Sequence, residues 1–141
     1  MSLSLRIHHA RSRGSTSTVP AAFRMTAAIW VLSILLIGEF IMAPINLWTG
    51  RTMLNFTRFT GYRPQLARLG FAPVKLLTAV LIAIGLAVRF AGLLGAALTS
   101  AICVLYLVRL AAPGRRDGAG IAGFTLFGLW AVALLALQLA R

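Results

Sequence analysis

The sequence is poor in acidic residues and in cysteine, and each shortage excludes a class of protein. Only 11% of the 141 residues are charged, whereas soluble domains usually carry about 25% charged residues. Glu39 is the only acidic residue inside the apolar blocks, too few for catalysis by paired carboxylates. Cys103 is the single cysteine, which excludes an internal disulfide, a CxxC pair and a cysteine-based metal cluster. With no nucleophile motif and no glycine-rich phosphate loop either, the sequence gives no catalytic residue, metal site or cofactor.

Basic residues, in contrast, are in large excess and give the chain a formal net charge of +12. All of them except Lys75 are arginines, and they are scattered between apolar blocks rather than gathered in one stripe. This distribution does not fit nucleic acid, whose phosphates are bound by clustered cations. It fits the anionic head groups of a lipid bilayer, which is the partner that we expect.

Hydrophobic residues make up 60% of the chain and fall into four long blocks. A helix needs about 20 apolar residues to cross a bilayer, and we expect spans at about 25–48, 72–89, 91–110 and 118–140. The predicted fold class is an all-α membrane protein, a four-transmembrane-helix bundle (residues 25–141) after a disordered basic tail (residues 1–24). Four spans put both termini on one side. The basic flank before the first span favours cytoplasmic termini, with the bundle in the plasma membrane of a bacterium.

The connection between the first two blocks, residues 49–71, has the pattern of an amphipathic segment lying along the membrane interface. Aromatic residues recur every third position at Phe56, Phe59 and Tyr62, with Arg58 among them and Arg51, Arg63 and Arg68 on either side. Gly61 and Pro64 are expected to break the segment into two short pieces. The residues expected to anchor the protein at the interface are Trp30, Trp48, Arg51, Arg58, Tyr62 and Arg63.

The second apolar block is short and is flanked by Lys75 and Arg89. We expect these two side chains to reach outward to the two interfaces, and the chain to turn at residues 89–92 into the third span. Small residues at four-residue spacing, such as Gly92 with Ala96 and Gly123 with Ala119, are typical of close contacts between membrane helices. They indicate contacts within one bundle or within a homo-oligomer.

Glu39 is the residue that most indicates a site, because a charged side chain in the middle of a span costs roughly 2.5–3.5 kcal/mol to insert. Lys75 is its expected partner, since both residues would be reached from the same side of the membrane. The candidate polar or ion-pair site comprises Glu39, Lys75, Asn46 and Thr78. Two interpretations remain open: a structural ion pair that joins the first two helices, and a site for a proton or a ligand.

A set of short motifs gives a second line of inference. They are Gly38 and Glu39 in the first span, a Gly-Tyr-Arg-Pro stretch at residues 61–64, and Leu69, Gly70 and Lys75 at the entry to the second helix. In these motifs, residues 27–139 resemble the DoxX-like family of small four-helix membrane proteins. Many members of that family carry the Lys in the first helix and the Glu in the second, so the signs are exchanged here. The resemblance implies a small membrane subunit, in some members associated with quinone-linked oxidoreductases or oxidative-stress complexes.

Three functions therefore remain open. The first is a non-catalytic membrane subunit or scaffold that works with a partner protein, which the resemblance places in a quinone-linked or redox complex. The second is a carrier of a small molecule or a proton that uses the region of Glu39 and Lys75 as a polar path. The third is a membrane enzyme that acts on a lipid or a quinone together with residues of a partner. A water-accessible Glu39 would favour the carrier, and a bound chromophore or quinone would favour the enzyme.

Overall fold

The computed structural model of the chain describes residues 20–112, apart from the side chain of Phe59, and residues 118–141. The predicted tail lies outside the described residues up to residue 19, and so does the connection at 113–117. Four described helices are long and apolar enough to cross a membrane: Ala21–Trp48, Pro64–Gly85, Arg89–Leu110 and Gly118–Ala140. A short helix lies between the first two. The predicted fold class, an integral membrane protein with four spans and a short helix after the first, is confirmed.

The first span, α1 (Ala21–Trp48), has 28 residues. At the helical rise it is about 42 Å long, more than the ~30 Å hydrocarbon core of a bilayer. One face of α1 is buried, including Ile29, Leu36 and Phe40. The opposite face is apolar and exposed, as at Val31 and Ile34. An exposed apolar face of this length is what lipid covers in a membrane helix.

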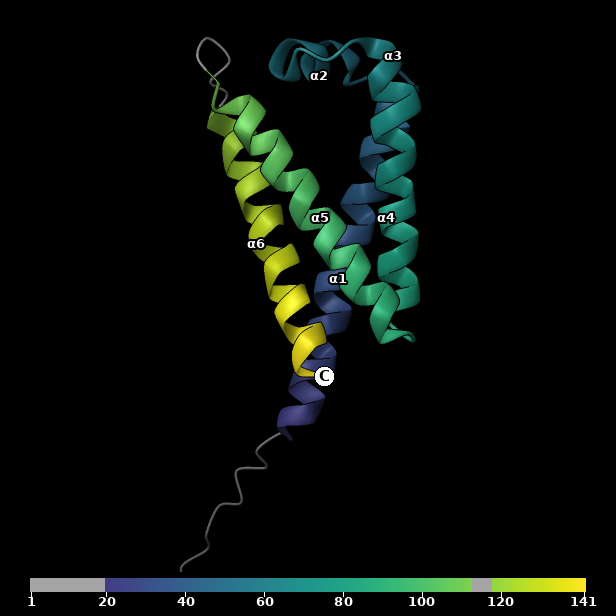
Figure 1. Cartoon of the computed structure of the whole chain (residues 1–141), viewed down its shortest axis with the longest axis vertical. Helices are drawn as coiled ribbons and strands as arrows, with labels where there is room; N and C mark the ends of the chain where they lie inside the picture. The colour runs from purple at the N-terminus through teal and green to yellow at the C-terminus, as the bar shows by residue number, and fades with distance from the viewer. Residues whose placement is uncertain (1–19, 113–117) are drawn as a thin grey trace, which may run out of the picture.

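The short helix α2 (Met53–Thr60) lies across one end of the bundle (Figure 1). It is amphipathic, with Met53 buried and Phe56 half-buried on one face and Arg58 exposed on the other. Gly61 ends the helix at a φ of 70°, in the left-handed conformation that glycine adopts without strain. The interfacial segment predicted from the spacing of the aromatic residues is therefore a helix, and it ends at the glycine expected to break it.

The second span begins earlier than its apolar block indicated. Pro64 starts a helix made of α3 (Pro64–Leu66), the π-helical turn η1 (Ala67–Phe71) and α4 (Ala72–Gly85). Proline is favoured at the first position of a helix, because an N–H at that position would have no partner within the helix. The residue expected to break the chain thus also begins the second span, about two turns before residue 72. The indole of Trp48 donates a 3.1 Å hydrogen bond to the carbonyl of Arg68 and joins the end of α1 to η1.

The third span, α5 (Arg89–Leu110), follows after a turn at residues 86–88, a few residues before the expected turn at 89–92. Gly85 and Gly92 set this position, because the two backbones touch there. A Cβ added to Gly85 would lie 2.2 Å from the Cα of Gly92. Arg89 is therefore the first residue of α5. Its guanidinium donates hydrogen bonds of 2.9 and 2.7 Å to the carbonyls of Gln138 and Leu139, at the end of α6 (Gly118–Ala140).

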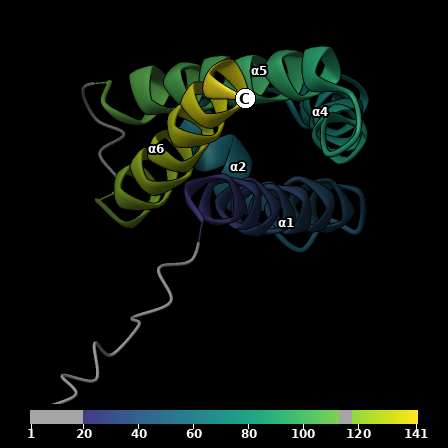
Figure 2. The same cartoon turned by 90° about the horizontal axis from the view of Figure 1, so that it is seen from below.

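The largest buried core lies toward the end of the bundle where the described chain begins and ends. It joins α1, α4, α5 and α6 through Ile29, Leu36, Ile82, Ala96, Ala131 and Leu134. Figure 1 places the start of α1 and the C-terminus at this end and α2 at the other. Seen from the terminal end, the four long helices surround a centre behind which α2 lies (Figure 2). Toward α2, α5 and α6 lean away from α1 and α4 (Figure 1), so α2 covers the wider end of the bundle.

Candidate functional site: a buried lysine beneath α2

Lys75 lies inside the bundle, enclosed by protein. Only 4% of its surface is exposed. Because its helix begins at Pro64, eleven residues earlier, Lys75 lies about 16 Å along the span, close to three turns. The expectation that its side chain reaches outward to the interface is wrong, since it followed from starting the helix near residue 72.

Three aromatic rings surround the Lys75 ammonium. Its nitrogen lies 5.1 Å from the ring centre of Tyr106, 5.5 Å from that of Phe40 and 5.7 Å from that of Phe124. These rings come from α5, α1 and α6, so the lysine on α4 is enclosed by the other three spans. Tyr106 and Phe124 are stacked, with ring centres 4.5 Å apart, and Phe56 of α2 meets Tyr106 edge to face at 5.9 Å. Two rings of the cage, Tyr106 and Phe124, thus belong to a larger aromatic cluster that includes Phe56.

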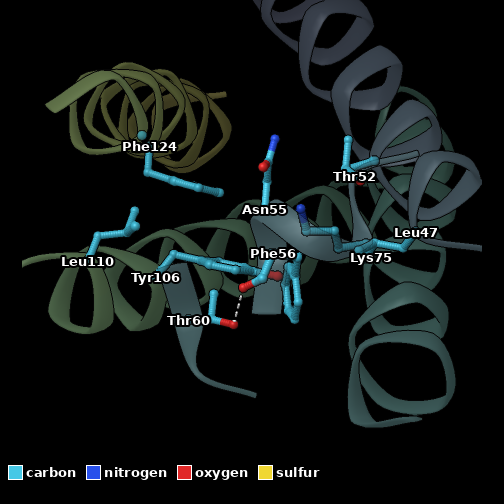
Figure 3. A pocket seen from close by; sticks show the side chains of 11 residues that line it. Leu47, Thr52, Asn55, Phe56, Thr60, Lys75, Tyr106, Leu110 and Phe124 are labelled. Carbon is cyan, nitrogen blue, oxygen red and sulfur yellow. Dashed lines mark hydrogen bonds between the residues drawn. The ribbon is translucent and has the colours of Figure 1, made fainter. Parts of the chain in front are cut away.

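The ammonium also faces a cavity of about 170 Å³. Figure 3 shows Lys75, Asn55, Phe56, Tyr106 and Phe124 directed toward this space from four helices. α2 contributes Asn55 and Thr60 to the lining, and the spans contribute Lys75, Tyr106 and otherwise apolar residues. The lining residues are Ala43, Leu47, Thr52, Asn55, Phe56, Thr60, Lys75, Tyr106, Leu110, Gly120 and Phe124.

The opening of the cavity is on the α2 side. Asn55 lines the cavity and is exposed on the surface, and Thr52 beside it is half-buried. The deeper residues Lys75 and Tyr106 are both buried. Toward the opposite end the bundle is closed by the core around Leu36. A molecule in this space would therefore enter past α2 and meet the lysine at the bottom.

Among the described residues, no acceptor forms a hydrogen bond or a direct ion pair with the Lys75 ammonium. Glu39 is half-buried. Its charge and that of Lys75 interact through space, without an N–O contact within 4.0 Å. Cys103 is buried and lies within electrostatic range of both charges. The ionisable groups inside the bundle are thus gathered in one region, while the ammonium keeps its donors unpaired.

The aromatic cage formed by Phe40, Tyr106 and Phe124 stabilises a positive charge on Lys75. A cation–π contact contributes about 0.5–2 kcal/mol, and a charged side chain in mid-membrane costs roughly 2.5–3.5 kcal/mol on insertion scales. Three rings at 5.1–5.7 Å therefore offset a large part of that cost. A ring face accepts no conventional hydrogen bond, however, so the cage stabilises the charge without supplying oxygen acceptors for the three N–H groups.

The other residues of the predicted polar site are not brought to the cavity. The hydroxyl of Thr78 is buried one turn beyond Lys75 and donates a 2.8 Å hydrogen bond to the carbonyl of Val74 in its own helix. Asn46 is half-buried near the end of α1 and does not line the cavity. The pairing of Glu39 with Lys75 stays a prediction.

The residues expected at the interface lie near the surface of the protein. Trp30 and Trp48 are 49% and 45% exposed. The arginines of the α2 region, Arg51, Arg58 and Arg63, are exposed as well. Tyr62 is half-buried, and the guanidinium of Arg109 lies 4.9 Å from its ring centre. Their role as anchors in the head-group zone stays a prediction.

Sequence reasoning did not identify Phe40, Tyr106 and Phe124 as site residues. They lie on three different spans, and no spacing along the chain connects them. One signal was available: the single lysine of the chain stands in an apolar block beside a first span with the single acidic residue of that region. The distribution of charge could therefore find the lysine, but the ring cage required the packing of four helices.

Comparison of the chain with protein-family models, with curated proteins and with solved structures gives no match.

Proposed function

We propose that this integral membrane protein is a non-catalytic subunit of DoxX-like type that holds a small ligand in the cavity beneath α2. The observation that carries the binding part is the buried Lys75 ammonium, which faces a 170 Å³ cavity and has no hydrogen-bond acceptor among the described residues. A buried polar group without a partner costs free energy, and that cost is recovered when a ligand supplies the missing acceptor.

The shape of the cavity favours binding over transport. Its polar lining from α2 is at one end, and the core formed by Leu36, Ile82 and Leu134 closes the other end. A carrier would have to open that packed core during each cycle. A bound ligand needs only the opening beside Asn55.

The subunit part of the proposal rests on the motifs around Gly38, residues 61–64 and Lys75. The redox or quinone-linked context is what those motifs imply in similar proteins. On this proposal the chemistry belongs to a partner, and the chain contributes a membrane-embedded binding site.

Native mass spectrometry of the protein purified from its own membranes in a lipid-preserving detergent tests both parts. The wild-type chain should retain a defined small molecule, and Lys75→Met should lose it. Arg24→Met is the matched control, because Arg24 is an exposed cation near the start of α1, at the other end of the bundle, and does not line the cavity; it should retain the molecule. A protein partner at a fixed ratio supports the subunit assignment.

Two results would contradict the proposal separately. Equal small-molecule content in the wild type and in a folded Lys75→Met variant would overturn the binding site. Recovery of the chain with its ligand but without any protein partner would overturn the subunit assignment and leave the binding site standing.

A further inference from the structure

We infer that the ligand of this cavity is a small amphiphilic monocarboxylate, whose carboxylate binds the Lys75 ammonium and whose apolar body is a single ring held between aromatic side chains. This inference rests on the proposed binding function and names the class of ligand. It follows from three properties of the cavity: its charge, its size and the position of its opening.

The charge of the cavity lining favours a ligand with one anionic group. Lys75 is the only basic side chain in the lining, and its nitrogen has no hydrogen-bond acceptor among the described residues. The nearby carboxylate of Glu39 makes no direct contact with it. One monoanion would neutralise one ammonium at close range, and a carboxylate supplies two acceptor oxygens for its N–H groups. A phosphate dianion would leave a second negative charge in an apolar space, because the lining offers no second cation.

The size of the cavity limits the ligand to one ring or its equivalent. A cavity of roughly 150 Å³ lined by apolar side chains can hold a benzene-sized molecule, and this one measures about 170 Å³. Its walls include Phe56, Tyr106 and Phe124, whose faces and edges favour contact with another planar ring. The glycerol unit and two acyl chains of a phospholipid are far larger than this volume, so a whole phospholipid does not fit inside the cavity.

The opening favours the approach of an anion from the head-group zone. The cavity opens beside Asn55, and the exposed cations Arg51 and Arg58 lie on the same short segment. No acidic residue is described in residues 49–71 to oppose them. Positive charge around an opening raises the local concentration of anions. The arginines would therefore attract the carboxylate and the deeper lysine would bind it.

A direct test is available because Lys75 is the only lysine of the chain. Biosynthetic labelling with lysine carrying ¹³C at Cε gives one side-chain NMR signal, which reports on this site alone. The protein, in nanodiscs of zwitterionic lipid, is titrated with 4-ethylbenzoate. The neutral control is 4-ethylbenzamide, which has nearly the same shape and no charge. Inorganic phosphate is the third probe.

We expect 4-ethylbenzoate to shift the Lys75 signal to saturation and to bind at least about tenfold more tightly than the amide, since a hydrogen bond to a charged group is much stronger than a neutral one. Phosphate should leave the signal unchanged. Isothermal titration of Lys75→Met should find that the preference for the acid over the amide is lost. The comparison of acid with amide on the wild-type protein stands even when that variant does not fold.

Equal affinity for acid and amide would overturn the carboxylate assignment and leave a cavity that binds small apolar molecules. Saturation by phosphate would overturn it in favour of a free inorganic anion. A signal that responds to none of the three probes, together with a co-purified molecule in the wild type that Lys75→Met loses, would reject this ligand class and retain the proposed binding function.

Discussion

Two opposite charges lie inside the bundle, Glu39 on α1 and Lys75 on α4, and their relation decides how the site works. They attract each other through space, but the nearest ring centre to the ammonium is that of Tyr106 at 5.1 Å. A lysine bound directly to a carboxylate would have little affinity for a second anion. A lysine held by aromatic rings, with the carboxylate at a greater distance, keeps its donors for a ligand.

A double-mutant cycle measures the interaction free energy between Glu39 and Lys75. We expect Glu39→Gln and Lys75→Met each to lower the stability of the bundle, and the double variant to lose less than the sum by about 1 kcal/mol, because each single variant leaves one charge uncompensated. Stability would be measured from thermal unfolding in detergent. Glu39→Gln combined with Arg109→Gln, which removes a cation stacked on Tyr62, is the control and should be additive. Additive losses in the first cycle would mean that the two charges are energetically independent.

The number of membrane spans could be predicted from the sequence, but not the first and last residue of every span. Long apolar runs define α1, α5 and α6, because lipid imposes a minimum length on any helix that crosses it. The helix of the second span begins at Pro64, before its apolar block near residue 72, since a proline that ends one segment can also be the first residue of the next helix. The expected depth of Lys75 along the span was counted from residue 72. It is greater in the structure, because the helix begins at Pro64.

The turn between α4 and α5 depends on a contact that the sequence does not reveal. Small residues at regular spacing occur on every span, but only the packed structure distinguishes those that touch a neighbour. Gly85, Gly92 and Gly95 lie against a neighbouring helix, whereas a Cβ on Gly123 would have nothing within 4 Å. The same residue type is therefore essential at one position and replaceable at another.

Alanine substitutions should separate these two kinds of glycine. Gly85→Ala places a methyl group 2.2 Å from the Cα of Gly92 and 2.6 Å from its nitrogen, so the two backbones must move apart. We expect a loss of about 1–3 kcal/mol, the usual cost of overpacking. Gly123→Ala, in open space within α6, should leave stability unchanged or raise it by up to about 1 kcal/mol through helix propensity. Similar unfolding temperatures for the two variants would contradict the close α4–α5 contact.

At the scale of the whole molecule, packing and binding are divided between the two ends of the bundle. The core of Ile29, Leu36 and Leu134 closes the terminal end. Arg89 donates hydrogen bonds to carbonyls in the last turn of α6 at the same end. The other end has the cavity, roofed by the amphipathic helix α2. The packed end thus keeps the four spans together, while the cavity at the other end includes the exposed side chain of Asn55.

The orientation of the bundle decides which compartment supplies the ligand. Basic residues are nearly balanced between the two ends, so the flank of the first span has the largest influence, and the arginines before α1 favour cytoplasmic termini. We propose on this basis that α2 and the opening beside Asn55 face away from the cytoplasm. An anion from outside the cell, or from the periplasm, would then be the one that reaches Lys75.

Cysteine labelling in intact cells tests this orientation. Leu54 is 83% exposed on α2, and Arg141 is exposed at the opposite end. We expect Leu54→Cys to react with a membrane-impermeant maleimide and Arg141→Cys to react only after the cells are permeabilised. Cys103 is 1% exposed, so the wild-type chain should give little background and serves as the control. Labelling of Arg141→Cys but not of Leu54→Cys in intact cells would reverse the bundle, and the cavity would then draw its ligand from the cytoplasm.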